Sequence, residues 1–305
     1  DGLIADIDLA LSIMDDAPDA ASLDEQDIIF GGDLDLWRRF ANTLKWRIYM
    51  RQSNARADVA QVGIAGLVGQ PLIDGPGDEP LVAFLDERQD LYNPQAQQEF
   101  QRPDDYGISA QMVALLESYD DPRLAVYARP AETNLNDGDT VYVGNRNGRQ
   151  LEQAEDDEDF SRIGAKFVEF DAPAYLMTYY ERLFLEAEAA ARGWITSDAQ
   201  ALYEAAVTAS FEHHGLEVGD YLAADGPAAY DGLTSIALQK YIALYSRGTE
   251  AYCEWRRTGV PTLEVADRAN IPSIPLRLPY PQSEEGANAQ NVPIVSLTDP
   301  VDWDN

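Results

Sequence analysis

The clearest hydrophobic pattern in the chain runs from Leu36 to Arg51. Apolar residues recur there at steps of three and four positions, and they are Trp37, Phe40, Ala41, Leu44 and Ile48. This spacing places them on one side of an α-helix, where they form a stripe that faces a hydrophobic core. A similar pattern from Leu3 to Met14 predicts an amphipathic helix at the start of the sequence.

The second half of the sequence predicts more helices. Apolar residues follow a helical period over Ala174–Arg192 and again over Ser197–His214, which together form a predicted helical hairpin. Small residues fall on it at the spacing that lets paired helices pack closely in a tetratricopeptide repeat, and they are Ala187, Ala199 and Ala206. A third long helix is predicted from Leu233 to Thr258.

The middle and the end of the chain show no such period. From Ala57 to about Phe170, Gly and Pro turn signals recur and only one short helix is predicted, around Ser109 to Ser118. The Pro-rich stretch from Pro261 to Pro300 cannot be regular helix, because proline lacks the backbone N–H that a helix needs. We expect it to run as an extended wrap over the surface.

The charge balance is strongly acidic. The chain carries 54 Asp and Glu against 22 Lys and Arg, a formal net charge of -32. Such a surface repels phosphate backbones, so nucleic acid is an unfavourable partner. Only Lys45, Lys166 and Lys240 are lysines. Because dense carboxylates hold water and cations at high ionic strength, the composition predicts a halophilic or marine source.

Two further features limit the chemistry and the location. Cys253 is the single cysteine, which excludes an internal disulfide and predicts a buried, inert thiol. No stretch has the roughly 18–20 apolar residues of a membrane-spanning helix. Because the sequence opens at Asp1 within a predicted amphipathic helix, we expect an N-terminal part, with any export signal, to lie outside it.

Four blocks of sequence carry more specific information. The first, Gly31 to Arg51, reads GGDLDLWRRFANTLKWRIYMR. The others are RPDDYGIS with YDDPRL, TYYERLFLEAEAAARGW, and QKYIALYSRGTEAYCEWRRTGVP, the last followed by RLPYPQSE. In this order they resemble the SusD/RagB-like family, in which a Trp precedes a Phe-Ala-Asn-Ser-Leu-Lys-Leu-Arg pattern. Thr43 and Trp46 depart from that pattern.

The resemblance implies a fold and a role. The fold is an all-α protein, a single SusD-like domain of tetratricopeptide-like helical pairs. Its parts are a helical 1–56, a loop-rich 57–170 for ligand binding, a repeat-like scaffold 171–260 and an extended wrap 261–305. The role is a non-enzymatic, lipid-anchored binding protein on the extracellular face of the outer membrane. It works with a TonB-dependent, SusC-like transporter that imports oligosaccharides or other polymer fragments.

Candidate ligand-binding residues come from the loop-rich region. Sugars present flat apolar faces edged with hydroxyls, so a site for them needs exposed aromatic rings beside amide or guanidinium groups. The candidates with this chemistry are Phe84, Tyr92, Asn93, Arg102, Tyr106, Tyr142, Asn145, Arg146 and Asn147. For each ring the alternative is a structural role, packed beneath its own loop.

Other functions remain as alternatives. A tetratricopeptide-type scaffold that binds protein segments is the second hypothesis, and an all-α polysaccharide hydrolase or lyase is the third. The only histidines, His213 and His214, are adjacent and lack the spacing of a zinc or nucleophile motif. No cofactor is expected. The oxygen-rich stretch from Asn134 to Asp139 suggests calcium but does not have the spacing of an EF-hand.

Overall fold

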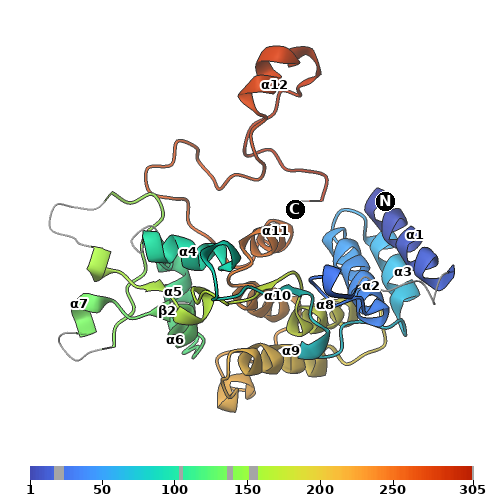
Figure 1. Ribbon diagram of the computed structural model, residues 1–305, viewed down its shortest axis with the longest axis horizontal. Helices are drawn as coiled ribbons and strands as arrows, with labels where there is room; N and C mark the ends of the chain where they lie inside the picture. Colours follow the sequence, from blue (N-terminus) through green and yellow to red (C-terminus); the bar gives the residue numbers. More distant parts are fainter. Residues whose placement is uncertain (17–23, 103–105, 136–139, 151–156, 304–305) are drawn as a thin grey trace.

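The structure is a computed structural model that describes residues 1–16, 24–102, 106–135, 140–150 and 157–303. Figure 1 shows three regions: the N-terminal helices at one end, the loop-rich region at the other, and the helices of the second half between them. The described strands are only two residues long each, so the predicted all-α fold is confirmed.

The N-terminal region is a layer of three helices, α1 (Gly2–Asp16), α2 (Leu34–Arg51) and α3 (Ala57–Leu67). α1 and α3 both pack against α2, which in turn packs against α8 (Figure 1). Asp33 starts α2, because its side chain accepts hydrogen bonds from the backbone N–H groups of Asp35 and Leu36. The buried residues of α2 are Asn42, Thr43, Trp46 and Met50, and the last two pack with Ile64 of α3. All five residues of the predicted apolar stripe are only half-buried, so the most buried face of α2 is not the predicted one.

The scaffold of the second half centres on a tight helical hairpin. α8 (Tyr179–Ala191) and α9 (Ala199–His213) pack along their length, with Ala187 and Ala206 buried between them as predicted. Small side chains permit this close approach, and Phe184, Tyr203 and Phe211 fill the adjoining core.

The prediction of one long helix from Leu233 to Thr258 is wrong. The segment forms α10 (Leu233–Ala243) and α11 (Gly248–Thr258), separated by a turn in which Ser246 adopts a left-handed conformation with φ of 70°. This turn directs Arg247 toward α8, where Nη1 lies 2.5 Å from Oε2 of Glu181. The ion pair favours the break, which a hydrophobic period alone does not reveal.

The loop-rich region contains more helix than its sequence pattern indicates. α3 and α4 (Pro94–Gln101) both lie where irregular structure was expected. The predicted short helix is α5 (Ala110–Ser118), and two single turns follow, α6 (Leu124–Tyr127) and α7 (Glu132–Leu135). Two antiparallel pairs tie the region together: β1 (Leu81–Val82) with β4 (Ala174–Tyr175), and β2 (Ala128–Arg129) with β3 (Arg162–Ile163).

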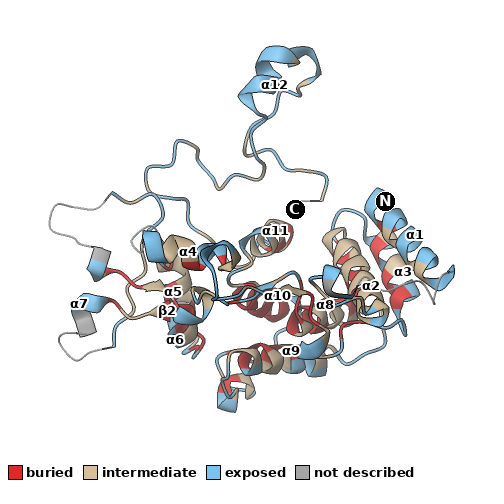
Figure 2. Ribbon diagram, in the orientation of Figure 1, coloured by how far each residue is buried: buried red, intermediate tan, exposed pale blue. Residues whose placement is uncertain are grey.

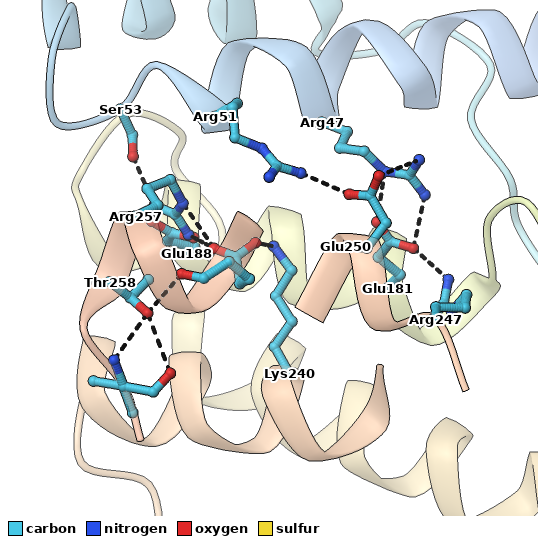
Figure 3. Close-up of polar contacts among 12 residues, drawn as sticks. Arg47, Arg51, Ser53, Glu181, Glu188, Lys240, Arg247, Glu250, Arg257 and Thr258 are labelled. Carbon is cyan, nitrogen blue, oxygen red and sulfur yellow. Dashed lines mark hydrogen bonds and ion pairs between the residues drawn. The ribbon is translucent and has the colours of Figure 1, made fainter. Parts of the chain in front are cut away.

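Buried ion pairs join the helices that contain the recurring sequence blocks. Glu181 of α8 accepts hydrogen bonds from Arg47 of α2, at 2.7 and 2.9 Å, and from Arg247 (Figure 3). Burial alone would raise the pKa of Glu181, but the two guanidinium groups lower it to about 2. The charged residues of three blocks therefore meet in the core and hold α2, α8 and α11 together.

A second buried polar group joins the other blocks. Arg123, between α5 and α6, donates to both carboxylate oxygens of Asp121 and to Oε1 of Gln239 on α10, the last at 2.6 Å. The hydroxyl of Tyr221 donates to Asp121 and accepts from Gln239. The YDDPRL and QKY blocks thus have a structural role, since their polar side chains satisfy one another inside the protein.

The C-terminal segment leaves α11 largely without regular structure. The prediction that the stretch from Pro261 to Pro300 contains no regular helix is wrong at one place, where the short α12 (Gln282–Ala287) is followed by a 3-10 turn (Ala289–Asn291). The first part of the C-terminal segment, 261–275, runs beside α5, whereas α12 and its flanks project away from the body and are largely exposed (Figures 1 and 2). Trp303 then lies 4.4 Å from the guanidinium of Arg256 on α11. Among the described residues, no helix is long and apolar enough to cross a membrane.

Candidate functional site

The start of α4 is fixed by Asn93. Its Oδ1 accepts a hydrogen bond from the backbone N–H of Gln95 at 2.7 Å, and its Nδ2 donates to the carbonyl of Ala172, also at 2.7 Å. The backbone N–H of Asn93 donates to the carbonyl of Phe170. Asn93 is therefore a buried helix cap that joins α4 to the 170–172 segment, and its side chain is occupied by protein.

This cap brings together three rings, here called the aromatic group: Tyr92, Phe100 and Phe170. Tyr92 stacks on Phe170 with ring centroids 4.1 Å apart and an interplanar angle of 23°. Phe100 meets Phe170 edge to face and is 78% exposed. The exposed Phe100 beside the stacked pair gives this group the geometry of a platform for a flat apolar ligand surface.

The base of the aromatic group is also anchored. Leu81 of β1 pairs with Tyr175 of β4. β1 precedes the segment that carries Tyr92 and Phe100, and β4 follows the segment that carries Phe170. Beside them, Oε1 of Glu79 accepts the backbone N–H of Tyr179 at the start of α8, at 2.7 Å. Burial raises the pKa of Glu79 to about 7, and Nδ1 of His213 lies 4.0 Å from its second oxygen.

A second set of candidates lies on the loop that follows Tyr142. Asn145 pairs through its backbone with Ile108 and Ala110, at the start of α5. Gly148 has φ of +74°, and a Cβ at this position would overlap the carbonyl oxygen of Asp267. The loop is therefore held closely between α5 and the C-terminal segment.

Arg146 and Asn147 of this loop contact the C-terminal segment directly. Arg146 forms an ion pair with Asp267 at 2.7 Å, and the carbonyl of Asn147 accepts the backbone N–H of the same residue. Gln111 of α5 completes the attachment, since its amide both donates to and accepts from the backbone of Glu264, at 3.0 and 2.8 Å. These contacts hold the 146–147 loop and α5 against residues 264–267 of the C-terminal segment.

Between α5 and the 261–275 segment lies a cleft of about 1150 Å³, here called the α5 cleft. Arg146 and Asn147 line it, together with Tyr241 of α10. The remaining lining is mostly apolar and comes from α5, the 261–275 segment and Leu297. A concave, largely apolar site with a few polar groups is the usual form of a small-ligand site.

The other candidates are neither rings of the aromatic group nor residues that line the α5 cleft. Tyr142 is half-buried and packs against the cluster that contains Ile108 and Val113, which is the structural alternative. Phe84 is half-buried after β1, Arg102 is exposed at the end of α4, and Tyr106 is 53% exposed. Phe100 and Phe170 were not among the residues predicted from the sequence. The signal that could have identified Phe100 is the Asn93-Pro94 helix start before it.

The structure bears on metal and acid–base chemistry as well. Within the part of the chain that is described, no group of three His, Cys, Asp or Glu could hold a metal ion. Residues 136–139 of the oxygen-rich stretch lie outside it. Burial lowers the pKa of His213 to about 4, and Lys166 adds to this effect. The buried Glu188 and Glu254 pair with Arg257, so they are committed to the core.

Comparisons with known proteins agree with this architecture. The family model described as "Starch-binding associating with outer membrane", a SusD-like family, matches residues 1–281. The chain therefore belongs to the SusD-like family, and the resemblance seen in the sequence is confirmed. None of the curated proteins compared with the chain matches it.

Solved structures match over almost the whole chain. A chitin-binding SusD homologue from Flavobacterium johnsoniae is 28% identical with a TM-score of 0.84, and the match covers 99% of this chain and 71% of that one. A SusD homologue from Bacteroides uniformis has the same TM-score and coverage at 24% identity. A third, from Bacteroides vulgatus, is 25% identical with a TM-score of 0.80, covering 94% of this chain and 65% of the other.

Proposed function

We propose that this chain is a non-enzymatic, surface glycan-binding protein that holds oligosaccharides on the aromatic group. The observation that supports this most directly is the exposed Phe100 beside the stacked pair of Tyr92 and Phe170, on a helix capped at its first turn. Rigid aromatic rings present apolar area at low entropic cost, which suits the flat face of a sugar ring.

The identity of the first ligand to test follows from the comparisons. The F. johnsoniae homologue is described as chitin-binding, and it is similar to this chain in sequence as well as in fold. We therefore expect binding to β-linked neutral polysaccharides, with chitin fragments tested first. A highly acidic chain of net charge -32 does not favour polyanionic glycans, because like charges repel.

The test is isothermal titration of the chain with chitin and glucan oligosaccharides at high salt, together with a search for released reducing ends. Phe100→Ala should weaken binding about tenfold or more by removing a stacking surface. Tyr280→Ala is the matched control, since Tyr280 is also an exposed ring but lies on the projecting segment near α12. Equal effects of both variants, or cleavage of an oligosaccharide, would count against the proposal.

The membrane part of the role is a separate step. We propose that the full-length protein is lipid-anchored to the outer membrane and covers a TonB-dependent, SusC-like transporter, as membership of the family suggests. Affinity purification from detergent-solubilised outer membranes should recover a barrel transporter in a fixed ratio to this protein. Recovery of the protein alone, under conditions where the fold is intact, would oppose this step.

We also propose that the protein works at high ionic strength. The chain has 54 acidic and 22 basic residues, so its negatively charged side chains repel one another. Salt screens this repulsion. Its melting temperature should rise between low and molar salt. An unchanged melting temperature would remove the halophilic interpretation and leave the glycan proposal unaffected.

A further inference from the structure

The lining of the α5 cleft has three properties that bear on a ligand. The first is its apolar surface, which comes from Met112 and Leu115 of α5 and from Leu263, Ile271 and Ile274 opposite them. An apolar substituent that packs against this surface is removed from water, which is favourable. The cleft thus fits a ligand that carries a small apolar substituent.

The second property is a set of polar groups that are available for a ligand. Tyr241, Asn147 and Asn270 are among the residues that line the cleft. Within the described ranges, the Tyr241 hydroxyl and the two side-chain amides have no hydrogen bond to another residue. Together they supply both donors and acceptors. An amide group, which has one N–H and one C=O, matches such a set.

The third property is charge. Arg146 is paired with Asp267, and Glu264 is the other charged residue of the lining. The cleft therefore has no unpaired cation for a carboxylate or sulfate, so a neutral ligand fits it better than an anionic one.

From these properties we infer that the α5 cleft is a second ligand site, which binds an N-acetylated sugar unit and gives the protein a preference for acetamido sugars. The inference rests on the proposed glycan-binding function. In it, the acetamido methyl group packs against the apolar lining, and its amide bonds with the Tyr241 hydroxyl and the side-chain amides. The aromatic group binds sugar faces regardless of the substituent, whereas the cleft distinguishes between substituents.

The test compares two probes of equal length, β-1,4-linked oligomers of N-acetylglucosamine and of glucose, by isothermal titration with the full chain. We expect the unaltered chain to bind the acetylated oligomer about tenfold more tightly, as two or three added hydrogen bonds and a buried methyl allow. Tyr241→Phe should weaken binding of the acetylated oligomer and so reduce that preference. Equal affinity of the unaltered chain for both oligomers would overturn the inference.

A blocking variant keeps the test independent of hydrogen bonding. Ala114 is exposed and lines the cleft, so Ala114→Trp should fill the cleft without disturbing the core and should abolish the preference. Ala205→Trp, at an exposed alanine of α9, is the matched control and should retain it. If Ala114→Trp retains the preference, the cleft is not the site, although glycan binding lost in Phe100→Ala would still support the aromatic group. If the unaltered chain binds neither oligomer, both proposals fail.

Discussion

Arg257 of α11 and Glu188 of α8 form a buried two-pronged ion pair, with Nη1 and Nη2 lying 2.6 and 2.7 Å from the two carboxylate oxygens. The same guanidinium donates to Glu254 and to the hydroxyl of Ser53, just after α2 (Figure 3). Lys240 of α10 supplies a second cation to Glu254. One arginine thereby joins three helical segments at the point where the C-terminal segment begins.

Removing that arginine should be severely destabilising. Arg257→Ala leaves Glu188 with Arg192 alone and Glu254 with Lys240 alone, and breaking the buried pair costs about 3–5 kcal/mol in the free energy of unfolding. Urea unfolding followed by circular dichroism measures this change. Arg88→Ala, at an exposed pair with Asp90, is the control and should change the same quantity by less than about 1 kcal/mol. Similar losses in the two variants would show that the buried pair is not an important tie.

The group around Arg123 yields a subtler prediction. Tyr221→Phe removes only a hydroxyl, but that hydroxyl donates to Asp121 at 2.7 Å and accepts from Gln239 at 2.9 Å. Both partners are buried, so the variant should lose about 1–3 kcal/mol of unfolding free energy. Tyr280→Phe, at an exposed ring, should be neutral within about 0.5 kcal/mol. A neutral Tyr221→Phe would mean that water replaces the hydroxyl.

The sequence predicts the helical scaffold well because its signals are local. Ala187 and Ala206 of the α8–α9 hairpin follow a helical period and are buried as predicted. The helical period of α2 also predicts its helix, but the stripe that carries the period is only half-buried. At the break between α10 and α11, Ser246 is left-handed and Arg247 forms an ion pair with Glu181, which is far away in the sequence. Sequence periodicity contains no information about such a contact.

The candidate site shows the same limit more strongly. Tyr92 was found because a ring in a non-helical stretch is conspicuous, but its partner Phe170 lies on a distant segment that β1 and β4 bring near. The side-chain amide of Asn93 is a group that could bind a sugar, but in the structure it caps α4. A residue type indicates what a side chain can bond, whereas its position in the fold decides which partner it meets first.

Glu79 makes the stability of the fold depend on pH. Burial raises its pKa from 4.5 to about 7, so the folded state prefers the protonated form more strongly than the unfolded state does. The stabilising contribution of Glu79 to the free energy of unfolding is therefore complete below pH 4.5 and is lost as the pH rises through about 7. Lys166 and Arg247 oppose the shift, while the neighbouring His213 has its pKa lowered to about 4 and stays neutral over this range.

Glu79→Gln isolates this effect, because glutamine retains the oxygen that accepts the Tyr179 N–H but does not ionise. The free energies of unfolding of the variant and the unaltered chain should agree near pH 4.5. Above pH 7 the free energy of unfolding of the variant should be higher by about 1–2 kcal/mol, and its melting temperature should be higher as well. Other titrating groups are common to both proteins, so they cancel in the difference. A difference that stays constant across the pH range would contradict the assignment to Glu79.

Gly148 controls how closely the Arg146 loop approaches the C-terminal segment. Gly148→Ala should have two costs: a left-handed backbone, at φ of +74°, and overlap of the new methyl with the carbonyl of Asp267. Gly193→Ala has almost the same φ, +73°, but its methyl would meet nothing within 4 Å, so it measures the backbone cost of about 1–2 kcal/mol alone.

The difference between the two glycine variants should therefore report the contact with Asp267. In Gly148→Ala, hydrogen exchange should accelerate at the Asp267 amide, whose bond to the carbonyl of Asn147 must lengthen or break. Gly193→Ala should leave that amide protected. Because the same contact fixes one wall of the α5 cleft, Gly148→Ala should also weaken binding of acetylated oligomers. If exchange at this amide is unchanged, the C-terminal segment is held by Gln111 and Arg146 without help from the glycine.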